Sequence, residues 1–210
     1  MKKKIAIVTG ASGGIGREFA KLLLDEDIDE IWAVARNQQK LDDLKEELGD
    51  KIITISRDLS KVSEVCEIGR RLEENAPVVS YLINNAGLAK MGSYKDFSID
   101  EIDSAVNVNC KTPVLLCSLC IPYMEKGSRI LNISSASAFQ PTPYLNLYAA
   151  AKAFLRSYSR ALNVELGSLG ITATAVCPGW VDTELLLKEI NGKKVKFPGI
   201  VTARQVAEKR

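Results

Sequence analysis

Histidine is absent from the 210 residues of this sequence. Its absence excludes the Ser-His-Asp and Cys-His arrangements of nucleophilic catalysis and most metal-dependent hydrolysis, because these rely on an imidazole. If the chain is an enzyme, its proton transfer must come from tyrosine, lysine, aspartate, glutamate or cysteine. We therefore expect no metal site.

Net charge is also nearly absent, because 28 lysines and arginines offset 26 aspartates and glutamates to leave +2. So small an excess argues against a nucleic-acid partner or a strongly acidic substrate. The opening "MKKK" precedes only about five apolar residues before the glycines begin, too short a run for a signal peptide or a membrane span. We expect no membrane partner and a cytoplasmic location.

Cysteine is scarce and irregularly spaced, with five residues at positions 66, 110, 117, 120 and 177. An odd, scattered set without a secretory signal predicts reduced thiols, as in the cytoplasm. Cys117 and Cys120 form a C-x-x-C, but they lie inside the apolar helical stretch "PVLLCSLCIPYM". A redox pair would normally lie at a helix N-terminus, and a zinc site would need two more ligands. The pair is predicted to pack in the core.

What the sequence does contain is a regular alternation of strands and helices. Short runs rich in β-branched residues lie at 4–9, 30–35, 51–56, 78–84, 128–134 and 170–177. Amphipathic stretches such as "QQKLDDLKEEL" separate them. This alternation predicts an α/β fold with a doubly wound parallel sheet covered by helices on both faces. The length suits one such domain and is short for two, so 1–210 is predicted to be a single domain.

The first predicted strand runs directly into the glycine-rich segment "TGASGGIG" at 9–16, and a helix follows. Glycines at 10, 14 and 16 permit a tight turn and the close approach of a pyrophosphate to the helix N-terminus. Free N–H groups and the helix dipole favour anions there. A simple turn is the alternative interpretation. The spacing is G-x-x-x-G-x-G rather than the common G-x-G-x-x-G.

The segment "YAAAK" at 148–152 pairs a tyrosine with a lysine across three alanines. Alanine is the best helix former, so the segment is predicted to be helical. Residues four apart share one helix face, which places Tyr148 and Lys152 side by side. Such a pair can also arise by chance, so other motifs must decide its meaning.

Four motifs occur in order: "TGASGGIG", "NNAG" at 84–87, "YAAAK" and "PGWVDT" at 178–183. Together they make nearly the whole chain resemble the short-chain dehydrogenase/reductase family. The resemblance implies a three-layer Rossmann-type sheet with strand order 3-2-1-4-5-6, and hydride transfer between a nicotinamide and an alcohol–carbonyl pair. The closing "VTARQVAEKR" reads as the helix that normally precedes a final strand, so we expect that strand to be absent or beyond the chain end.

The resemblance also assigns the proton chemistry. It implies that Tyr148 is the general acid/base and that Lys152 lowers its pKa while binding the nicotinamide ribose. Ser135 matches the family serine that hydrogen-bonds the substrate oxygen, with Ser134 and Ser137 as lesser alternatives. A strand-end serine that satisfies local backbone groups would be the interpretation if Ser135 stood alone.

Two long helices are predicted over 106–124 and 149–166. The first carries Asn109, which matches the family asparagine that helps to hold a water linked to the lysine, with Asn107 as the alternative. Both stretches carry more apolar surface than one sheet face requires, and family members pair these helices across a two-fold axis. We therefore expect a homodimer or homotetramer.

A dinucleotide site is implied by the same resemblance. Its expected residues are Gly10, Ser12, Gly13, Gly14, Ile15, Gly16, Arg36, Asp58, Leu59, Asn85, Ala86, Gly87, Tyr148, Lys152, Pro178, Gly179 and Thr183. The 85–87 segment should border the adenosine and ribose. Asp58 and Leu59 should contact the adenine, although a solvated loop acid is the alternative for Asp58. Pro178, Gly179 and Thr183 should shape the nicotinamide end.

Cofactor choice is expected to depend on the residue after the second strand. An acid there usually binds the ribose hydroxyls of NAD. This chain has Arg36 instead, which resembles family members that prefer NADP, where the guanidinium meets the 2′-phosphate. Position 13 is a glycine, where many NADP users add a second basic residue, and Arg17 is a weaker substitute. NADP is the expected cofactor, with NAD possible.

A small substrate lobe is expected at about 183–200. Several apolar residues suggest a largely apolar pocket for a carbonyl or alcohol substrate: Trp180, Leu185, Leu186, Phe197, Leu88 and Leu145. Core packing is the alternative for each of them. Two rival functions remain open from the sequence. A non-catalytic dinucleotide-binding regulator need not keep the four catalytic residues together. Epimerase- or dehydratase-type relatives tend to have a larger C-terminal substrate domain.

Overall fold

The computed structural model describes residues 2–184, 186, 189–190 and 193–209. At its centre lies a six-stranded sheet with the order β3-β2-β1-β4-β5-β6, in which every neighbouring pair is parallel. Its strands are β1 (Lys4–Thr9), β2 (Glu30–Ala35), β3 (Ile52–Ser56), β4 (Val78–Asn84), β5 (Arg129–Ile133) and β6 (Thr172–Val176). The predicted fold class and strand order are confirmed.

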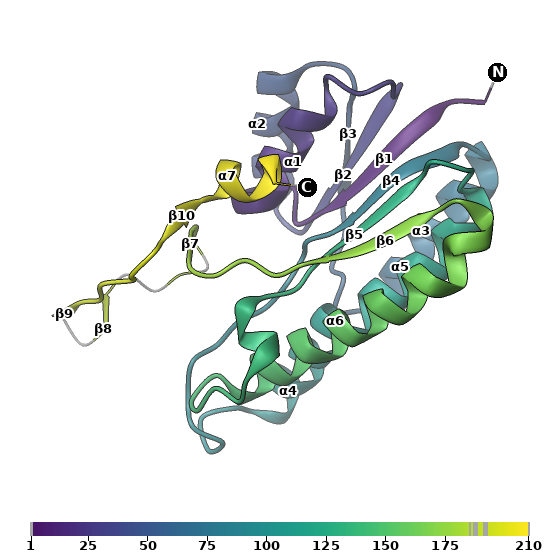
Figure 1. Ribbon diagram of the computed structural model, residues 1–210. Helices are drawn as coiled ribbons and strands as arrows, with labels where there is room; N and C mark the ends of the chain where they lie inside the picture. The colour runs from purple at the N-terminus through teal and green to yellow at the C-terminus, as the bar shows by residue number, and fades with distance from the viewer. Residues whose placement is uncertain (1, 185, 187–188, 191–192, 210) are drawn as a thin grey trace.

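Helices cover both faces of this sheet and complete three layers (Figure 1). One face carries α1, α2 and α7, and the other carries α3, α5 and α6. The helices are α1 (Gly14–Leu23), α2 (Gln38–Leu48), α3 (Val62–Asn75), α4 (Ile99–Val106), α5 (Thr112–Cys120), α6 (Asn146–Leu166) and α7 (Ala203–Glu208).

Two hydrophobic cores result from the alternation of side chains along the strands. On β1, Ile5 and Ile7 join the core under α3, α5 and α6, whereas Ala6 and Val8 join the core under α1 and α2. All four are almost fully buried, as expected for a parallel strand with helices on both faces.

The C-x-x-C pair packs in the first of these cores, as predicted. Cys117 and Cys120 are fully buried on α5, and both are free thiols. Burial raises the pKa of Cys117 to about 11 and raises that of Cys120 as well, because the thiolate loses its hydration. Neither thiol is suited to redox chemistry at neutral pH.

The helix predicted over 106–124 is part of a longer helical stretch, Ile99–Tyr123, which is less regular than expected. A π-helical turn over Asn107–Lys111 separates α4 from α5, and a 3-10 turn over Ile121–Tyr123 follows. By length and composition, the 25-residue stretch Ile99–Tyr123 would suffice to cross a membrane. Its apolar α5 side instead packs against the sheet, where Leu116 is fully buried.

The C-terminal segment adds small elements outside the main sheet. β7 (Val181–Asp182) pairs in parallel with β10 (Val201–Thr202), and β8 (Glu189–Ile190) pairs with β9 (Lys193–Lys194) in antiparallel fashion. The helix predicted near the end of the chain is α7, which lies against α1 and buries Val206 and Ala207. Within the described residues the main sheet has six strands.

Because the strands are parallel, the loops that follow β1, β2, β4, β5 and β6 all emerge at the same edge of the sheet. This edge brings together motifs that are far apart in the sequence.

Candidate functional site

The glycine loop between β1 and α1 is fastened to the loop that follows β4. The Asn85 side-chain amide donates to the carbonyl oxygens of Thr9 (3.0 Å) and Gly10 (3.3 Å). In return, the Thr9 hydroxyl accepts from the backbone N–H groups of Asn85 and Ala86, both at 3.0 Å, and donates to the Ile83 carbonyl. In this structure the Asn85 amide therefore binds the neighbouring loop, and its predicted place beside the adenosine stays a prediction.

This contact leaves no room for side chains at two glycines. A Cβ at Gly16 would lie 2.3 Å from the Gly10 carbonyl oxygen and 2.5 Å from the Asn85 Nδ2 atom. Gly10 also has φ of +67°, a conformation that L-residues rarely adopt, and a Cβ there would lie 2.7 Å from the same amide. The loop can therefore lie this close to the loop after β4 only with glycine at both positions.

The loop fits the pyrophosphate of a dinucleotide. Helix α1 begins at Gly14, and within the described residues no side chain caps its first N–H groups. Such groups bind anions, and the helix dipole strengthens them. Gly13 has open space where its side chain would be, and Thr183 lies across the loop, with its methyl carbon 3.1 Å from a Cβ position at Gly14. Ser12 and Ile15 are half-buried beside them.

The ends of β2 and β3 place Arg36 near Asp58. Arg36 is exposed just before α2. Burial opposes the charge of Asp58, but hydrogen bonds from Ser60 and the nearby cations Lys61 and Arg36 outweigh it and lower the pKa of the carboxyl. The Leu59 side chain is buried in the core, so Asp58 is the member of the predicted adenine pair that a ligand can reach.

Two other cations near this edge are already paired. Arg17 forms an ion pair with Glu47, so it is not free to take the place of the basic residue missing at position 13. The Lys40 Nζ atom donates to both carboxylate oxygens of Glu184, at 2.9 and 2.7 Å.

The π-helical turn places Asn109 in the site and Asn107 outside it. The Asn109 side chain is buried, and its amide nitrogen donates to the carbonyls of Leu88 (2.8 Å) and Ala105 (3.0 Å). Asn107 is half-buried and donates to the Asp103 carboxylate. The additional residue in the turn rotates these side chains relative to a regular α-helix, and such turns are frequent at functional sites.

Tyr148 and Lys152 lie together on the first turns of α6. The Lys152 Nζ atom is 5.4 Å from the centroid of the Tyr148 ring and donates to the Ile133 carbonyl at 2.8 Å. Ser135, which follows β5, lies beside the Tyr148 hydroxyl and acts to lower its pKa. Ser134 is buried and donates to the Lys152 carbonyl at 2.7 Å, so it supports the helix rather than facing a ligand.

Burial dominates the electrostatics of this pair. Desolvation raises the pKa of Tyr148, and the neighbouring Ser135 side chain offsets only part of that rise. Desolvation lowers the pKa of Lys152 to about 8, against a weaker upward effect of the Cys110 and Cys177 thiols. The sequence predicted that the lysine lowers the tyrosine pKa. In this structure the pKa is raised, because the desolvation of the buried phenolate is the largest effect.

Gly87 lets Asn109 and Lys152 approach each other. A Cβ at Gly87 would lie 3.0 Å from the Asn109 Oδ1 atom and 3.4 Å from the Lys152 Nζ atom. The two polar groups therefore flank the backbone of the NNAG segment. All four residues predicted as catalytic lie around the carboxyl ends of β4 and β5.

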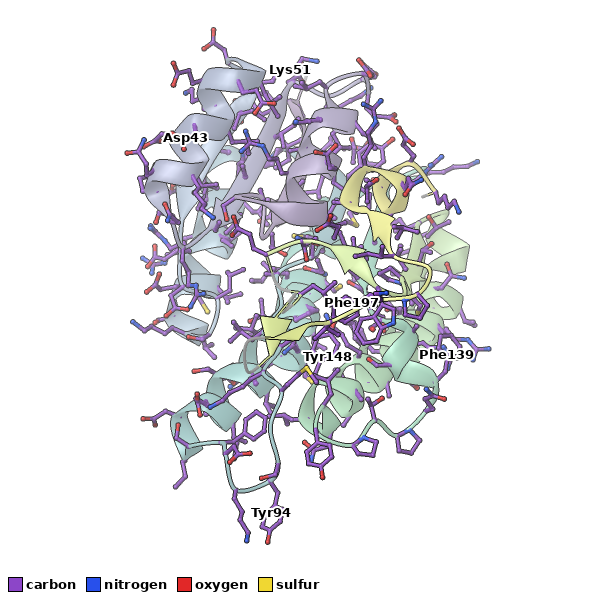
Figure 2. The ribbon with its side chains drawn as sticks, turned by 90° about the vertical axis from the view of Figure 1, so that its left-hand side faces the viewer. Asp43, Lys51, Tyr94, Phe139, Tyr148 and Phe197 are labelled. Carbon is purple, nitrogen blue, oxygen red and sulfur yellow. The ribbon has the colours of Figure 1, made fainter. Side chains whose placement is uncertain are left out.

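The PGWVDT segment forms the far wall of the site. The Pro178 carbonyl accepts from the Ala136 N–H at 2.8 Å, which ties this segment to the loop after β5, and Gly179 is exposed beside it. The Trp180 and Phe197 rings contact each other, with centroids 4.9 Å apart. Figure 2 labels Phe197 and Tyr148 among the side chains of this view. Leu186 is half-buried, and Leu185 lies outside the described residues.

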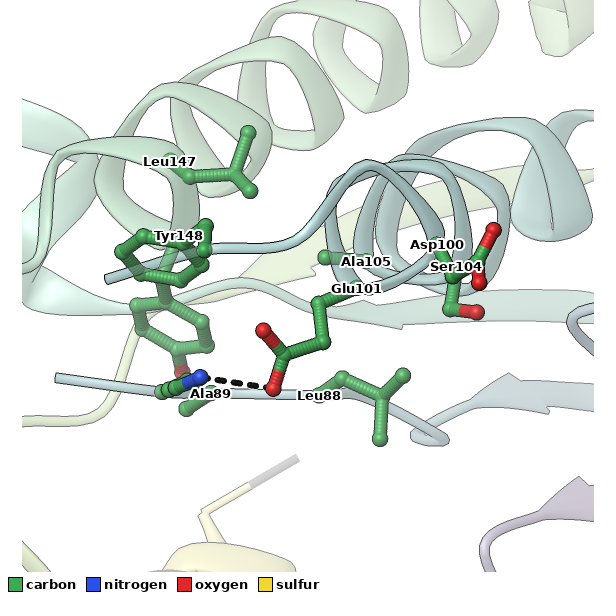
Figure 3. Close-up of a pocket in the computed structure, with 10 residues that line it drawn as sticks. Leu88, Ala89, Asp100, Glu101, Ser104, Ala105, Leu147 and Tyr148 are labelled. Carbon is green, nitrogen blue, oxygen red and sulfur yellow. Dashed lines mark hydrogen bonds and ion pairs between the residues drawn. The ribbon is translucent and has the colours of Figure 1, made fainter. Parts of the chain in front are cut away.

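A cavity of about 310 Å³ adjoins the tyrosine (Figure 3). It lies between α4, the start of α6 and the loop that follows β4, and its apolar lining consists of Leu88, Ala89, Phe97, Ala105, Leu147 and the Tyr148 ring. Of the residues predicted to form an apolar pocket, Leu88 belongs to this cavity. Trp180, Leu186, Phe197 and Leu145 are not among the residues that line it.

Sequence reasoning missed Thr9 and a buried polar chain behind the site. Asn84 donates to Asn132 at 2.8 Å, and Asn132 donates to Ser159 at 2.9 Å, which links β4 and β5 to α6. All three side chains are buried. Polar residues inside otherwise apolar strands were the available signal, because a buried amide requires a partner.

Comparison with known proteins agrees with this geometry. Residues 4–194 match the sequence profile described as short chain dehydrogenase. An uncharacterized oxidoreductase of Staphylococcus epidermidis is 30% identical over 187 residues, which cover 88% of this chain and 81% of that protein.

Solved structures give the same result. A short chain dehydrogenase from Burkholderia cenocepacia in complex with NADP superposes with a TM-score of 0.86 and 29% identity, covering 99% of this chain and 88% of that one. A 3-ketoacyl-(acyl-carrier-protein) reductase from Brucella melitensis complexed with NADH superposes with a TM-score of 0.84 and is 27% identical. The match covers 99% of this chain and 89% of that one.

The glycine loop generates a paired test. Gly16→Ser should destabilise the fold by about 1–3 kcal/mol, because its Cβ would overlap the Gly10 carbonyl and the loop would have to move. In a chain of this size the midpoint of thermal unfolding should fall by at least about 2 °C. Gly13→Ser is the matched control, since nothing lies within 4 Å of its Cβ position. Equal unfolding midpoints for the two variants would contradict the close approach described here.

Proposed function

Since this chain belongs to the short-chain dehydrogenase/reductase family, whose members act on alcohol and carbonyl groups with a nicotinamide dinucleotide, we propose that it is an NADP(H)-dependent oxidoreductase in which Tyr148 is the general acid/base. The observation that carries the proposal is the position of the Tyr148 hydroxyl, which lies beside Ser135 and one helical turn from a buried Lys152.

The bound reduced nicotinamide would supply the hydride, and the protein must supply the proton. Burial raises the pKa of Tyr148, so the hydroxyl keeps its proton at neutral pH and can donate it to a carbonyl oxygen. Ser135, which lies beside that hydroxyl, would bind the same oxygen. In the oxidative direction Tyr148 would have to lose its proton first, which favours alkaline pH.

Lys152 and Asn109 would restore the proton after each turnover. The lysine donates one hydrogen bond to the Ile133 carbonyl, which leaves other ammonium hydrogens for a ribose hydroxyl or a water. The Asn109 side chain faces the same backbone, at Gly87. A pKa of about 8 lets Lys152 change its charge near neutral pH, as a proton relay requires.

The NADP preference is supported by the charges after β2. Arg36 is exposed there, and guanidinium groups bind phosphates in a bidentate manner. Asp58 is the nearby acid that would weaken binding of a 2′-phosphate.

Assembly into a homodimer or homotetramer is supported by apolar side chains on α4 and α6. Ile99 is 85% exposed and Val164 is 79% exposed. Ile102, Val106 and Phe154 are also exposed on these helices. A monomer would leave this surface in contact with water.

The proton role is tested by Tyr148→Phe. The substitution keeps the ring but removes the hydroxyl, so kcat for carbonyl reduction should fall by about 10²–10⁴-fold, the usual contribution of general acid catalysis. Steady-state kinetics on a ketone that the parent reduces would measure the change, with circular dichroism to check folding.

Tyr123→Phe is a matched control, because this tyrosine lies in the 3-10 turn after α5. It should leave kcat unchanged. The parent should also oxidise alcohols faster as pH rises, since Tyr148 then loses its proton. Normal turnover by Tyr148→Phe would reduce the tyrosine to a packing residue.

Cofactor preference is tested by Arg36→Gln. Loss of a charge-assisted phosphate contact worth about 2–3 kcal/mol should weaken NADPH binding by about 30- to 150-fold and leave NADH binding nearly unchanged. Fluorescence titration gives both dissociation constants. Arg17→Gln is the control, because Arg17 is paired with Glu47. Equal affinity of the unmodified protein for NADPH and NADH would overturn the assignment.

Assembly is tested by multi-angle light scattering at micromolar concentration. We expect the mass of a dimer or tetramer for the parent and a shift toward monomer for Phe154→Glu, which places a charge on the exposed face of α6. Val62→Glu, on α3, is the control. A monomeric parent would refute the expected assembly.

A further inference from the structure

The polar side of the cavity next to Tyr148 is built around one ion pair. The Lys90 Nζ atom donates to the Glu101 carboxylate at 2.6 Å and to the Asp96 carbonyl at 2.8 Å, and it lies 5.3 Å from the centroid of the Phe97 ring. The other Glu101 oxygen accepts from the Ser98 N–H at 2.9 Å. Figure 3 shows the Lys90–Glu101 pair as a dashed line. Both charges are therefore satisfied by the protein.

A carboxylate remains without a counterion. Asp100 lines the cavity and is exposed, and among the described residues no hydrogen bond or ion pair engages its side chain. Ser104, one turn further along α4, adds a hydroxyl to the lining. With Lys90 matched by Glu101, the lining has an excess of one negative charge and no unpaired cation.

The cavity is also coupled to the catalytic residues. The Tyr148 ring forms part of its wall. Two other lining residues, Leu88 and Ala105, provide the carbonyl oxygens that hold the Asn109 amide. A substituent on a carbonyl group bound at Tyr148 can therefore extend into this space.

We infer, on the basis of the proposed function, that the substrates are neutral or ammonium-bearing ketones and secondary alcohols with one compact apolar substituent that fills this cavity. A volume of about 310 Å³ is at the lower end of small-molecule pockets, so the substituent is of aryl or short alkyl size. Carboxylate- or phosphate-bearing substituents are rejected, because they would meet Asp100 and find no free cation.

Three ketones on one scaffold test the charge preference: acetophenone, 4-acetylbenzoate and 4-(aminomethyl)acetophenone. Their rings are alike, and the substituents are neutral, negative and positive at neutral pH. We expect kcat/KM for the benzoate to be at least tenfold below that for acetophenone. The ammonium compound should be reduced as well as acetophenone or better.

Asp100→Asn isolates the unpaired carboxylate. It should reduce the ratio of kcat/KM for acetophenone to kcat/KM for the benzoate at least threefold, because it removes the repulsive charge and leaves the Lys90–Glu101 pair in place. Asp25→Asn is the matched control. Asp25 is also exposed, has no hydrogen bond or ion pair among the described residues, and does not line the cavity. Asp25→Asn should leave the ratio of the two kcat/KM values unchanged.

Ala105→Leu tests whether the substrate enters this space. Its larger side chain should lower kcat/KM for acetophenone at least tenfold while 2-butanone, which is much smaller, changes less than twofold. The Ala105 carbonyl that holds Asn109 belongs to the backbone and is retained. Equal losses for both ketones, or none for either, would show that the cavity does not bind the substrate and would overturn the inference.

The outcomes separate this inference from the proposed function. If the protein reduces 4-acetylbenzoate as well as acetophenone, the substrate class is wrong while the proposed function stands. If Asp100→Asn and Asp25→Asn behave alike, Asp100 does not set the selectivity. A protein that binds NADPH, shown by fluorescence titration, but reduces none of the ketones would overturn the proposed function together with the inference.

Discussion

The hydrogen bonds between Asn85 and the loop after β1 are the contact on which the rest of the site depends. They join the two central strands, β1 and β4, at the edge where the sheet meets its ligands. The amide occupies the space next to Gly10 and Gly16, so any side chain there would push the loops apart. One contact thus explains why the glycine motif and the NNAG motif occur together in this chain.

The burial of Lys152 makes the site electrostatically unfavourable for folding. Desolvation lowers the pKa of Lys152 from 10.5 to about 8, so between these values the unfolded chain binds more protons than the folded chain. The contribution of Lys152 to the free energy of unfolding therefore becomes less unfavourable as pH rises across that window. Below about pH 8 the lysine is charged in both states, and its burial destabilises the folded chain fully. A group kept at a site where its charged form is disfavoured, on the same helix as Tyr148, is typical of a functional position.

Charge pairing limits which cations can act on ligands. Arg17 and Lys40 each form an ion pair with a glutamate. Arg36 has Asp58 as its neighbour, and this carboxylate also accepts hydrogen bonds from Ser60 and is close to Lys61. At the cavity, Lys90 is likewise neutralised by Glu101. A count of basic residues near a motif overestimates the positive charge available to a phosphate or a carboxylate, because most of these cations form ion pairs within the protein.

The sequence by itself determined the α/β fold class, and the resemblance of its four motifs to the family supplied the order of the strands. Burial on both faces requires apolar strands, and four of the six predicted runs agree closely with β1, β2, β3 and β4. It also determined that Tyr148 and Lys152 share a helix face, because that depends only on a spacing of four residues within α6.

The tertiary structure alone decided the remaining features. A π-helical turn set Asn109 inward, and no local pattern predicted that turn. Asn85 was turned toward Gly10, and burial raised the pKa of Tyr148 although Lys152 lies one turn away. These outcomes depend on which loops meet at the sheet edge and on how much water they exclude, and both are set by contacts between residues far apart in the chain.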